Sequence, residues 1–422
     1  MIKASSLLFT LVISLLIAIV SSSLILFAYI ARTQFQNYEI NQQLNLNADS
    51  GLNLLLSRQS LVDINQQKNI DLYGRGEDSV ELIRKTWGAY EIAVSRTHFK
   101  NTKVKRIAQV GYHPDSSHLY SMYIPDHNKP IALCGKTIIK GKAFLPKAGV
   151  KRTYIEGQSF EGDNLINGTI KKSESTLPEF NKDLIKNIDT VFSTQIFSND
   201  DSVMNIANQL ADDTLKNSFL NRTLVLKSAG PIEISGGIYS GNIVIISQTQ
   251  ITISSSTASI ENVILFAPRI IIENEFKGNL QAFASDSIFI SNNVSLQYPS
   301  VLGLFQNKKS PRIPAIVLNE GAVVSGNIII NSTSTASTTL AGLILQSGAI
   351  VNGQVYCNGF ADIKGTINGS LMCTKIILVT PSSVYENHLL NATIDVSQLS
   401  EHYVGINLVK ESNVKKVVKW LN

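Results

Sequence analysis

The phrase that decides the fold occurs twice in the sequence, as GAVVSGNI at residues 321–328 and as GAIVNGQV at residues 348–355. The two phrases align position by position at an offset of 27 residues, and a related phrase, IKGTINGSL, follows at residues 363–371. Each phrase sets short β-branched runs between glycine and asparagine, which tolerate the positive φ angles of tight turns. A repeat of this length is typical of structural units stacked on one another.

Short apolar runs of three or four residues recur throughout residues 224–379, without helical periodicity. Such strands cannot bury a core alone, but stacked coils cover one another's apolar rows. We therefore predict a mainly β fold: a right-handed β-solenoid over residues 221–380, with about six or seven coils of roughly 20–27 residues. The phrase GKTIIKGKAFL at residues 135–145 predicts that the first coils lie in residues 129–172. A sandwich or barrel is the alternative, and it would show longer, alternating strands.

The remaining segments interrupt or flank this pattern. Residues 173–220 are predicted to form a mainly helical insertion, with helices at 180–190 and 204–216. Residues 381–422 are predicted to form strands and a basic tail, with Lys410, Lys415, Lys416 and Lys419, that caps the last coil; a tail that lies on an anionic surface is the alternative. Residues 32–128 are predicted to hold a juxtamembrane helix and a small α+β region, with a helix at 79–85 and strands at 87–95, 103–111 and 118–124.

The amino-terminal segment contains 24 consecutive uncharged residues, 7–30, enough for a helix to cross a hydrocarbon core of about 30 Å. It lacks the shorter apolar core and small-residue cleavage site of a secretory signal peptide. Residues 1–31 are therefore predicted to be a retained single-pass anchor in the lipid bilayer. By analogy we place the Ser-, Thr- and Asn-rich bulk of the chain outside the cytoplasm.

Two resemblances sharpen these expectations. Residues 3–11 (KASSLLFTL) and 48–52 (ADSGL) resemble the start and the end of the long helix of type IV pilin-like proteins, especially minor pilins and pseudopilins. This resemblance implies a processing site between Ala4 and Ser5, pilin-like or secretion-apparatus subunits as partners, and a bacterial inner-membrane or pilus location. The phrase GAIVNG at residues 348–353 resembles polymer-forming bacterial β-helix proteins of the bactofilin type, which implies a scaffold capable of self-assembly.

The sequence offers few candidates for chemistry. Glu273 and Glu275 are expected to share a strand face, where two carboxyl groups about 5–10 Å apart could serve a glycosidase, although a solvated edge explains them too. His113 and His118 lie near acidic residues and could bind a divalent metal, although scattered loop histidines are the alternative. Cys134, Cys357 and Cys373 are expected to be buried core residues, with an oxidised pair of the last two as the alternative.

Composition and charge limit the function further. A net charge of +5 over 422 residues is too small to imply a nucleic-acid partner, three cysteines exclude a disulfide framework, and two tryptophans leave little for stacking on carbohydrate. No cofactor is expected. We therefore expect a non-enzymatic, membrane-anchored cell-envelope protein that acts as a scaffold or surface-binding component. The alternative is a membrane-tethered β-helix enzyme that acts on polysaccharide.

Overall fold

The computed structural model describes residues 3–57, 61–74, 79–114, 119–198, 201–206, 209–211, 214–254, 258–306, 313–332, 341–409 and 414–421. The chain divides into two compact units, the first being Met1–Lys85 with Ala93–Ile107 and the second Thr86–Ile92 with Ala108–Asn422. Among the described residues β-strands dominate, and one long apolar helix lies at the amino terminus, as predicted.

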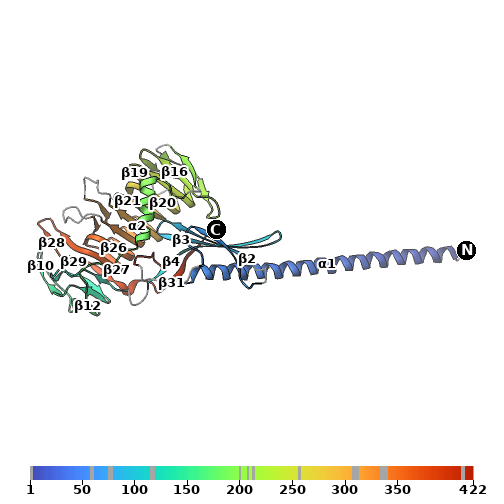
Figure 1. Ribbon diagram of the computed structural model, residues 1–422, viewed down its shortest axis with the longest axis horizontal. Helices are drawn as coiled ribbons and strands as arrows, with labels where there is room; N and C mark the ends of the chain where they lie inside the picture. Colours follow the sequence, from blue (N-terminus) through green and yellow to red (C-terminus); the bar gives the residue numbers. More distant parts are fainter. Residues whose placement is uncertain are drawn as a thin grey trace. The chain divides into compact units, whose positions relative to one another are not determined.

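The first unit begins with helix α1 (Lys3–Leu56), a single helix of 54 residues (Figure 1). It is long enough and apolar enough to span a membrane. Its large apolar side chains from Leu7 to Ile30 are all exposed in the chain by itself, with Leu7 at 71%. The predicted continuation of the apolar span into one longer helix is confirmed.

The last third of α1 packs on strands of the first unit. Strands β1 (Gln66–Asp71), β2 (Ser79–Trp87), β3 (Tyr90–Phe99) and β4 (Thr102–His113) are hydrogen-bonded neighbours in that order, and the boundary between the two units passes through β2, β3 and β4. Leu44, Ala48 and Leu52 of the helix are buried. A Cβ on Gly51 would lie 2.5 Å from Ser95 Oγ and 2.7 Å from Val80 Cγ1. Glycine lowers helix propensity at this position, but it allows the helix to approach the strands closely.

The helix predicted at residues 79–85 is wrong, because β2 occupies this segment. Val80 and Leu82 are buried while Ser79 and Glu81 are more exposed, which is the two-residue period of a strand. The segment is too short for a helical period to be distinguished from this alternation. The strand predicted at 87–95 corresponds to the end of β2 and most of β3, and the strand predicted at 103–111 corresponds to β4. Within the strand predicted at 118–124, the described residues form only the short strand β5 (Met122–Tyr123).

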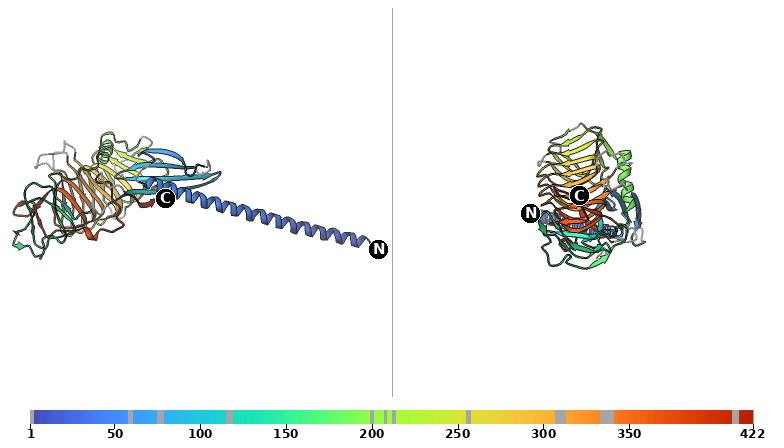
Figure 2. Two further views of the ribbon diagram at one scale, coloured as in Figure 1. Left: turned by 60° about the horizontal axis from the view of Figure 1, so that its bottom comes forward. Right: turned by 90° about the vertical axis from the view of Figure 1, so that its left-hand side faces the viewer.

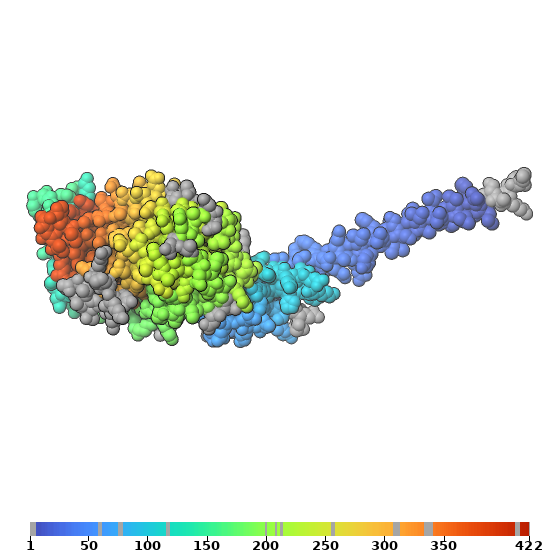
Figure 3. All heavy atoms as spheres, turned by 90° about the horizontal axis from the view of Figure 1, so that it is seen from above, coloured from blue at the N-terminus to red at the C-terminus, as the bar shows by residue number. Residues whose placement is uncertain are grey.

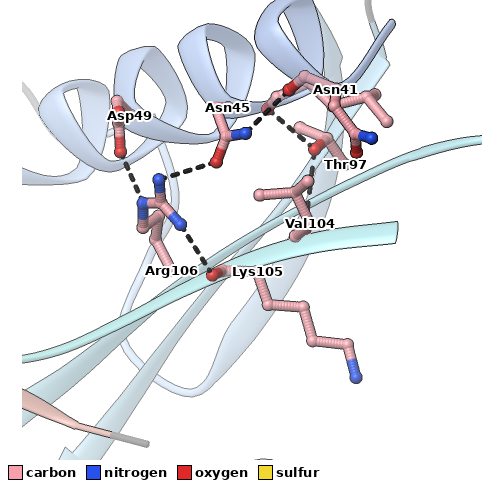
Figure 4. A network of polar contacts seen from close by, with 8 residues as sticks. Asn41, Asn45, Asp49, Thr97, Val104, Lys105 and Arg106 are labelled. Carbon is pink, nitrogen blue, oxygen red and sulfur yellow. Dashed lines mark hydrogen bonds and ion pairs between the residues drawn. The ribbon is translucent and has the colours of Figure 1, made fainter. Parts of the chain in front are cut away.

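A polar network joins α1 to β4 (Figure 4). Arg106 Nε donates to Asp49 Oδ1 over 2.7 Å, and its Nη2 donates to Asn45 Oδ1 over 2.8 Å. On the neighbouring strand, the buried Thr97 hydroxyl donates to the Leu44 carbonyl over 3.0 Å. Charge-assisted hydrogen bonds are stronger and more directional than neutral ones, so Arg106 fixes the register of the helix against the strand.

The second unit is built from parallel strands that stack in register and close on themselves (Figure 2). These strands are β5, β7 (Ile138–Lys140), β8 (Ala143–Leu145), β12 (Ile170–Lys172), β13 (Ser202–Asn205), β14 (Gln209–Leu210), β15 (Thr214–Asn217), β16 (Leu224–Ser228), β17 (Ile232–Ile234), β18 (Ile238–Ser247), β19 (Gln250–Ile253), β20 (Ser259–Ile272), β21 (Lys277–Ile290), β22 (Ser295–Phe305), β23 (Ala315–Leu318), β24 (Val323–Asn331), β25 (Gly342–Leu345), β26 (Ile350–Ile363), β27 (Thr366–Val379) and β30 (Thr393–Asp395).

One column of register partners runs through the core of this stack. Its members are all buried and apolar, in the order Leu226, Ile245, Leu265, Ala282, Leu302, Ile328, Val355, Leu371, Met122 and Ala143. Each strand therefore covers the apolar row of its neighbour, which is how runs of three or four residues acquire a core. The predicted offset of 27 residues is confirmed, because Val323 pairs with Ile350.

The order of the stack differs from the order of the chain. Residues 129–172 were predicted to form the first coils, but in the stack they follow the strands of residues 221–380. Strand β5 pairs with β27, β8 pairs with β5, and β12 pairs with β8. In Figure 3 the turquoise atoms of this segment accordingly lie beside the red atoms of the carboxy-terminal strands. Local repeats predict that segments stack but do not specify which end receives them, so this order could not be inferred.

The predicted insertion at 173–220 is also corrected. Its first helix exists as α2 (Lys182–Thr194), capped by the Asn181 side chain, and it buries Leu184, Ile188 and Val191. The helix predicted at 204–216 is absent from the described residues there, which form β13, β14 and β15 and pair in parallel with β16, β17 and β18. These strands begin the stack. Their polar composition hides a strand signal that only the neighbouring coil supports.

The carboxy-terminal tail does not cap the last coil. Strand β31 (Val414–Leu421) holds Lys415, Lys416 and Lys419 and lies next to β4 in its sheet, whereas Lys410 is outside the described residues. Strand β27 is covered instead by β5 and β30. Smaller pairings complete the unit. Strand β28 (Val384–Glu386) pairs with β27, and β10 (Tyr154–Ile155) pairs with β11 (Gln158–Ser159). Strand β6 (Ile131–Cys134) lies between β29 (His388–Leu390) and β9 (Val150–Arg152) and pairs with both.

A surface ion pair of this region makes stability depend on pH. Hydrogen bonds from Lys375 (2.7 Å) and Lys129 (2.9 Å) lower the pKa of Glu386 from 4.5 to about 2. Because its folded-state pKa lies below the unfolded value, Glu386 stabilises the fold above about pH 4.5, and this contribution is lost as the pH falls toward 2. We expect Glu386→Gln to lower the melting temperature slightly at pH 7 and to match the parent near pH 2. A difference that stays constant over this range would contradict the assignment.

Candidate functional site

The two predicted carboxylates do not share a strand face. Glu273 and Glu275 lie in the exposed turn between β20 and β21, and Glu275 has a positive φ of 63°. Between them, the Asn274 side chain accepts a hydrogen bond of 3.0 Å from the backbone of Asn292 on the next turn. The turn thus fits the solvated edge that the sequence left open as the alternative to a glycosidase pair.

The histidines give no metal site among the residues that the structure describes, in which no group of three or more His, Cys, Asp or Glu side chains is placed to bind an ion. His113 lies at the end of β4, where its Nδ1 is 2.9 Å from the Tyr403 carbonyl oxygen. This contact connects β4 to the loop at residues 403–409 and gives His113 a structural role. His118 lies outside the described residues.

All three cysteines are buried and free, as the core interpretation predicts. Cys357 and Cys373 are register partners on β26 and β27 although they are only 16 positions apart, because the coil between these strands is shorter than 27 residues. Burial raises the pKa of the Cys357 thiol to about 12 and raises that of Cys373 well above its usual value. Thiols of this kind are poor nucleophiles.

We expect iodoacetamide at pH 8 to leave Cys357 and Cys373 unmodified in the folded protein and to modify both in denaturant, as measured by mass spectrometry of peptides. Exclusion from solvent and the raised pKa of each thiol both slow the reaction. Rapid labelling of either residue under native conditions would show that β26 and β27 separate easily.

A row of amide side chains projects outward from the stack and is buried by other segments of the second unit. Gln281, Asn327 and Gln354 occupy one column of register positions on β21, β24 and β26, together with Val301 of β22. Gln281 accepts a hydrogen bond from the Ala89 backbone (2.8 Å) and donates to the Trp87 carbonyl (3.1 Å). These bonds hold the turn between β2 and β3, residues of the second unit, against the stack.

Two buried tyrosines from other segments form hydrogen bonds with an amide of this column. Asn327 Nδ2 donates to the Tyr90 hydroxyl over 3.2 Å, and its Oδ1 accepts from the Tyr403 hydroxyl over 3.0 Å. Burial raises the pKa of Tyr90 and of Tyr403 above the usual range of a phenol. Both groups therefore stay protonated, and the column acts as structural support.

The second unit also contains an open groove of about 520 Å³, which we call the Trp420 groove. Its lining residues come from β15 and the turn after it, from β18, from β20 and from β31: Lys216, Asn217, Ser218, Phe219, Asn221, Ser240, Gly241, Glu261, Asn262, Lys419, Trp420 and Leu421. Small-molecule sites commonly have volumes of about 300–1,000 Å³ and combine apolar walls with a few placed polar groups. The volume of the groove lies in that range, and its lining mixes polar with apolar side chains.

Irregular backbone positions shape the groove. Asn217 is the register partner of Gly241, and the pairing of β18 with β20 shifts between Ser240 and Ile243. Gly241 has φ of 95°, and a Cβ on it would lie 2.1 Å from the Asn217 carbonyl oxygen. Glycine at this position lets the two coils approach closely.

Hydrogen bonds fix the amides along one wall. Asn217 Nδ2 donates to the carbonyl oxygens of Arg222 and Asn242, each over 2.8 Å, which determines the orientation of its side chain. Asn221 Nδ2 donates to Asn217 Oδ1 over 3.2 Å. Both amide protons of Asn217 are therefore engaged within the protein, and Asn217 in turn holds Asn221, which keeps its own oxygen and one amide proton for a ligand.

The opposite wall comes from β31. Lys419 Nζ forms an ion pair with Glu261, and Lys216 adds one further positive charge, so the lining of the groove has a net charge of +1. Trp420 is 58% exposed, whereas the second tryptophan, Trp87, is 3% exposed and packs against Phe219 with ring centroids 5.0 Å apart. A large, rigid indole on the surface beside aligned amides is an unusual use of an aromatic residue, because burial would stabilise it more.

Sequence reasoning missed this groove. Its residues are up to about two hundred positions apart in the chain, and β31 was expected to cap a coil rather than to line a surface. The one usable signal was Trp420 itself, in an alternating segment with lysines at 415, 416 and 419. Comparisons of the chain with protein-family models, with curated proteins and with solved structures give no match.

Proposed function

We propose that this protein is a non-enzymatic, membrane-anchored component of a bacterial cell envelope. Helix α1 anchors it as a single-pass protein of the inner membrane, and the bulk of the chain lies outside the cytoplasm, or at the cell surface if the protein assembles into a pilus. The stacked strands, wound as a right-handed β-solenoid, serve as a rigid scaffold with a surface for binding. The observation that carries this proposal is the two-part character of α1.

The first half of α1 exposes apolar side chains such as Phe27, while its last part buries Leu44, Leu52 and Leu55 against strands of the first unit. A helix that only anchored a protein would not need to continue into a packed core. This arrangement favours the pilin-like form of the proposal, in which one helix both enters the membrane and forms the spine of a small α+β unit. Pilin-like or secretion-apparatus subunits are then the expected partners of the exposed half.

The test is the mass of the mature amino terminus, measured on protein isolated from membranes of the native host, for the parent and for Ala4→Leu. Loss of the first four residues in the parent, and their retention in Ala4→Leu, are expected if a prepilin-type peptidase cuts before Ser5. Ser6→Leu is the matched control, since it lies outside the bond to be cut. An intact amino terminus on the parent would reject the pilin-like form and leave a plain signal anchor.

A further inference from the structure

The Trp420 groove combines three features that point to one class of ligand. Its exposed indole offers a flat apolar surface, Asn221 keeps an acceptor and one donor at a fixed position, and the lining, with Lys216, Lys419 and Glu261, has a net charge of only +1. We infer that the groove binds a neutral oligosaccharide. This inference rests on the proposed surface-binding role and deepens it by naming the ligand.

The match is chemical. One face of a pyranose ring carries only C–H groups and stacks on an indole, as other apolar rings do. The hydroxyl groups around its edge each donate and accept hydrogen bonds, and side-chain amides are suited to pair with both functions. Asn221 and Asn262 lie in the groove with Trp420, so one sugar ring can stack and form hydrogen bonds at the same time.

Charge argues against other ligands. A nucleic acid needs several positive charges, whereas Glu261 here engages Lys419 and the lining keeps one further lysine, Lys216, for a net charge of +1. An apolar peptide needs a larger hydrophobic lining than the side chains of Phe219, Trp420 and Leu421 provide. A volume of about 520 Å³ suits two or three hexose rings, and the open form of the groove lets a longer chain continue beyond it.

The two tryptophans make a direct test feasible. Trp87 is buried and Trp420 is exposed, so a ligand in the groove will change the fluorescence of Trp420 alone. The full-length protein is placed in nanodiscs, because detergents with sugar head groups would compete. Maltotetraose, cellotetraose and chitotetraose serve as probes, and calorimetry supplies a second measurement.

We expect at least one of the three probes to change the fluorescence saturably, and Trp420→Ala to weaken binding at least tenfold by calorimetry. Asn221→Ala, an exposed substitution on the opposite wall, is expected to weaken binding severalfold with no loss of thermal stability. Tyr154→Ala removes an aromatic ring that is 68% exposed outside the groove, and it is expected to bind as the parent does.

Absence of saturable binding to all three probes would overturn the inference, as would equal binding by Trp420→Ala. A response to an unfolded polypeptide such as casein, without a response to the saccharides, would assign the groove to a protein partner and would also overturn it. None of these results depends on cleavage after Ala4. Failure of the saccharide inference therefore remains distinguishable from failure of the proposed membrane and pilin-like role.

Discussion

Gly353→Ala is expected to destabilise the second unit by about 3–5 kcal/mol, the sum of backbone strain and a steric clash. Gly326, Gly353 and Gly369 are successive register partners, and each has a φ between 145° and 155°. A Cβ on Gly353 would lie 1.7 Å from the Gly326 carbonyl oxygen. This oxygen belongs to the backbone of the neighbouring coil, so the contact cannot be relieved by a side-chain rotation.

Thermal unfolding followed by circular dichroism measures this effect, with Gly348→Ala as the matched control. Gly348 also has a positive φ, of 78°, but the nearest atom to its Cβ position is 3.5 Å away. The control therefore carries the backbone strain, about 1 kcal/mol, without the clash. If the two variants melted at the same temperature, the close approach of successive coils at Gly353 would be disproved.

Asn327→Leu is expected to cost about 2–4 kcal/mol, because it leaves buried hydroxyl groups without their amide partner. Asn327 is fully buried and connects Tyr90 with Tyr403. The single proton of the Tyr403 hydroxyl is shared between Asn327 Oδ1 and the Gly326 carbonyl oxygen, 2.9 Å away, so it can be donated to the carbonyl alone once Asn327 is replaced. Most of the cost should therefore come from Tyr90, and the measurement is equilibrium unfolding in urea.

A double-mutant cycle with Tyr90→Phe tests this origin. If the Asn327–Tyr90 bond carries the cost, removing the Tyr90 hydroxyl will be nearly free in the Asn327→Leu background but costly in the parent. Costs that simply add would mean that the two groups do not interact. Both residues belong to the second unit, so the cycle reports on that unit alone.

The parts of the fold that could be predicted are those with local periodicity. The aligned phrases at 321–328 and 348–355 are in register in the structure, and the uncharged run at 7–30 is helical. The prediction failed at 79–85, where few residues were available to distinguish a period of two from one of 3.6, and at 204–216, where the polar composition of the described strands hides their signal. In both segments the neighbouring strand, and not local propensity, determines the conformation.

The candidate site lay beyond sequence reasoning for a different reason. A carboxylate pair or a histidine cluster has a pattern that can be searched for; the structure places Glu273 and Glu275 in a turn and His113 in a structural contact, and His118 lies outside the described residues. The Trp420 groove has no such pattern. Asn217, Glu261 and Trp420 become neighbours only because β15, β18 and β20 stack and β31 returns to them.

The permuted order of the stack also has a kinetic consequence. Strands β5 and β7 emerge from the ribosome long before β27 and β30, the strands with which they pair. Pairing between such distant segments requires the closure of a long loop and is slow. This end of the stack therefore completes only after nearly the whole chain has been made. Until then β5 and β7 lack these partners, so a newly made chain stays open to degradation and to pairing with other chains for longer than local repeats alone would require.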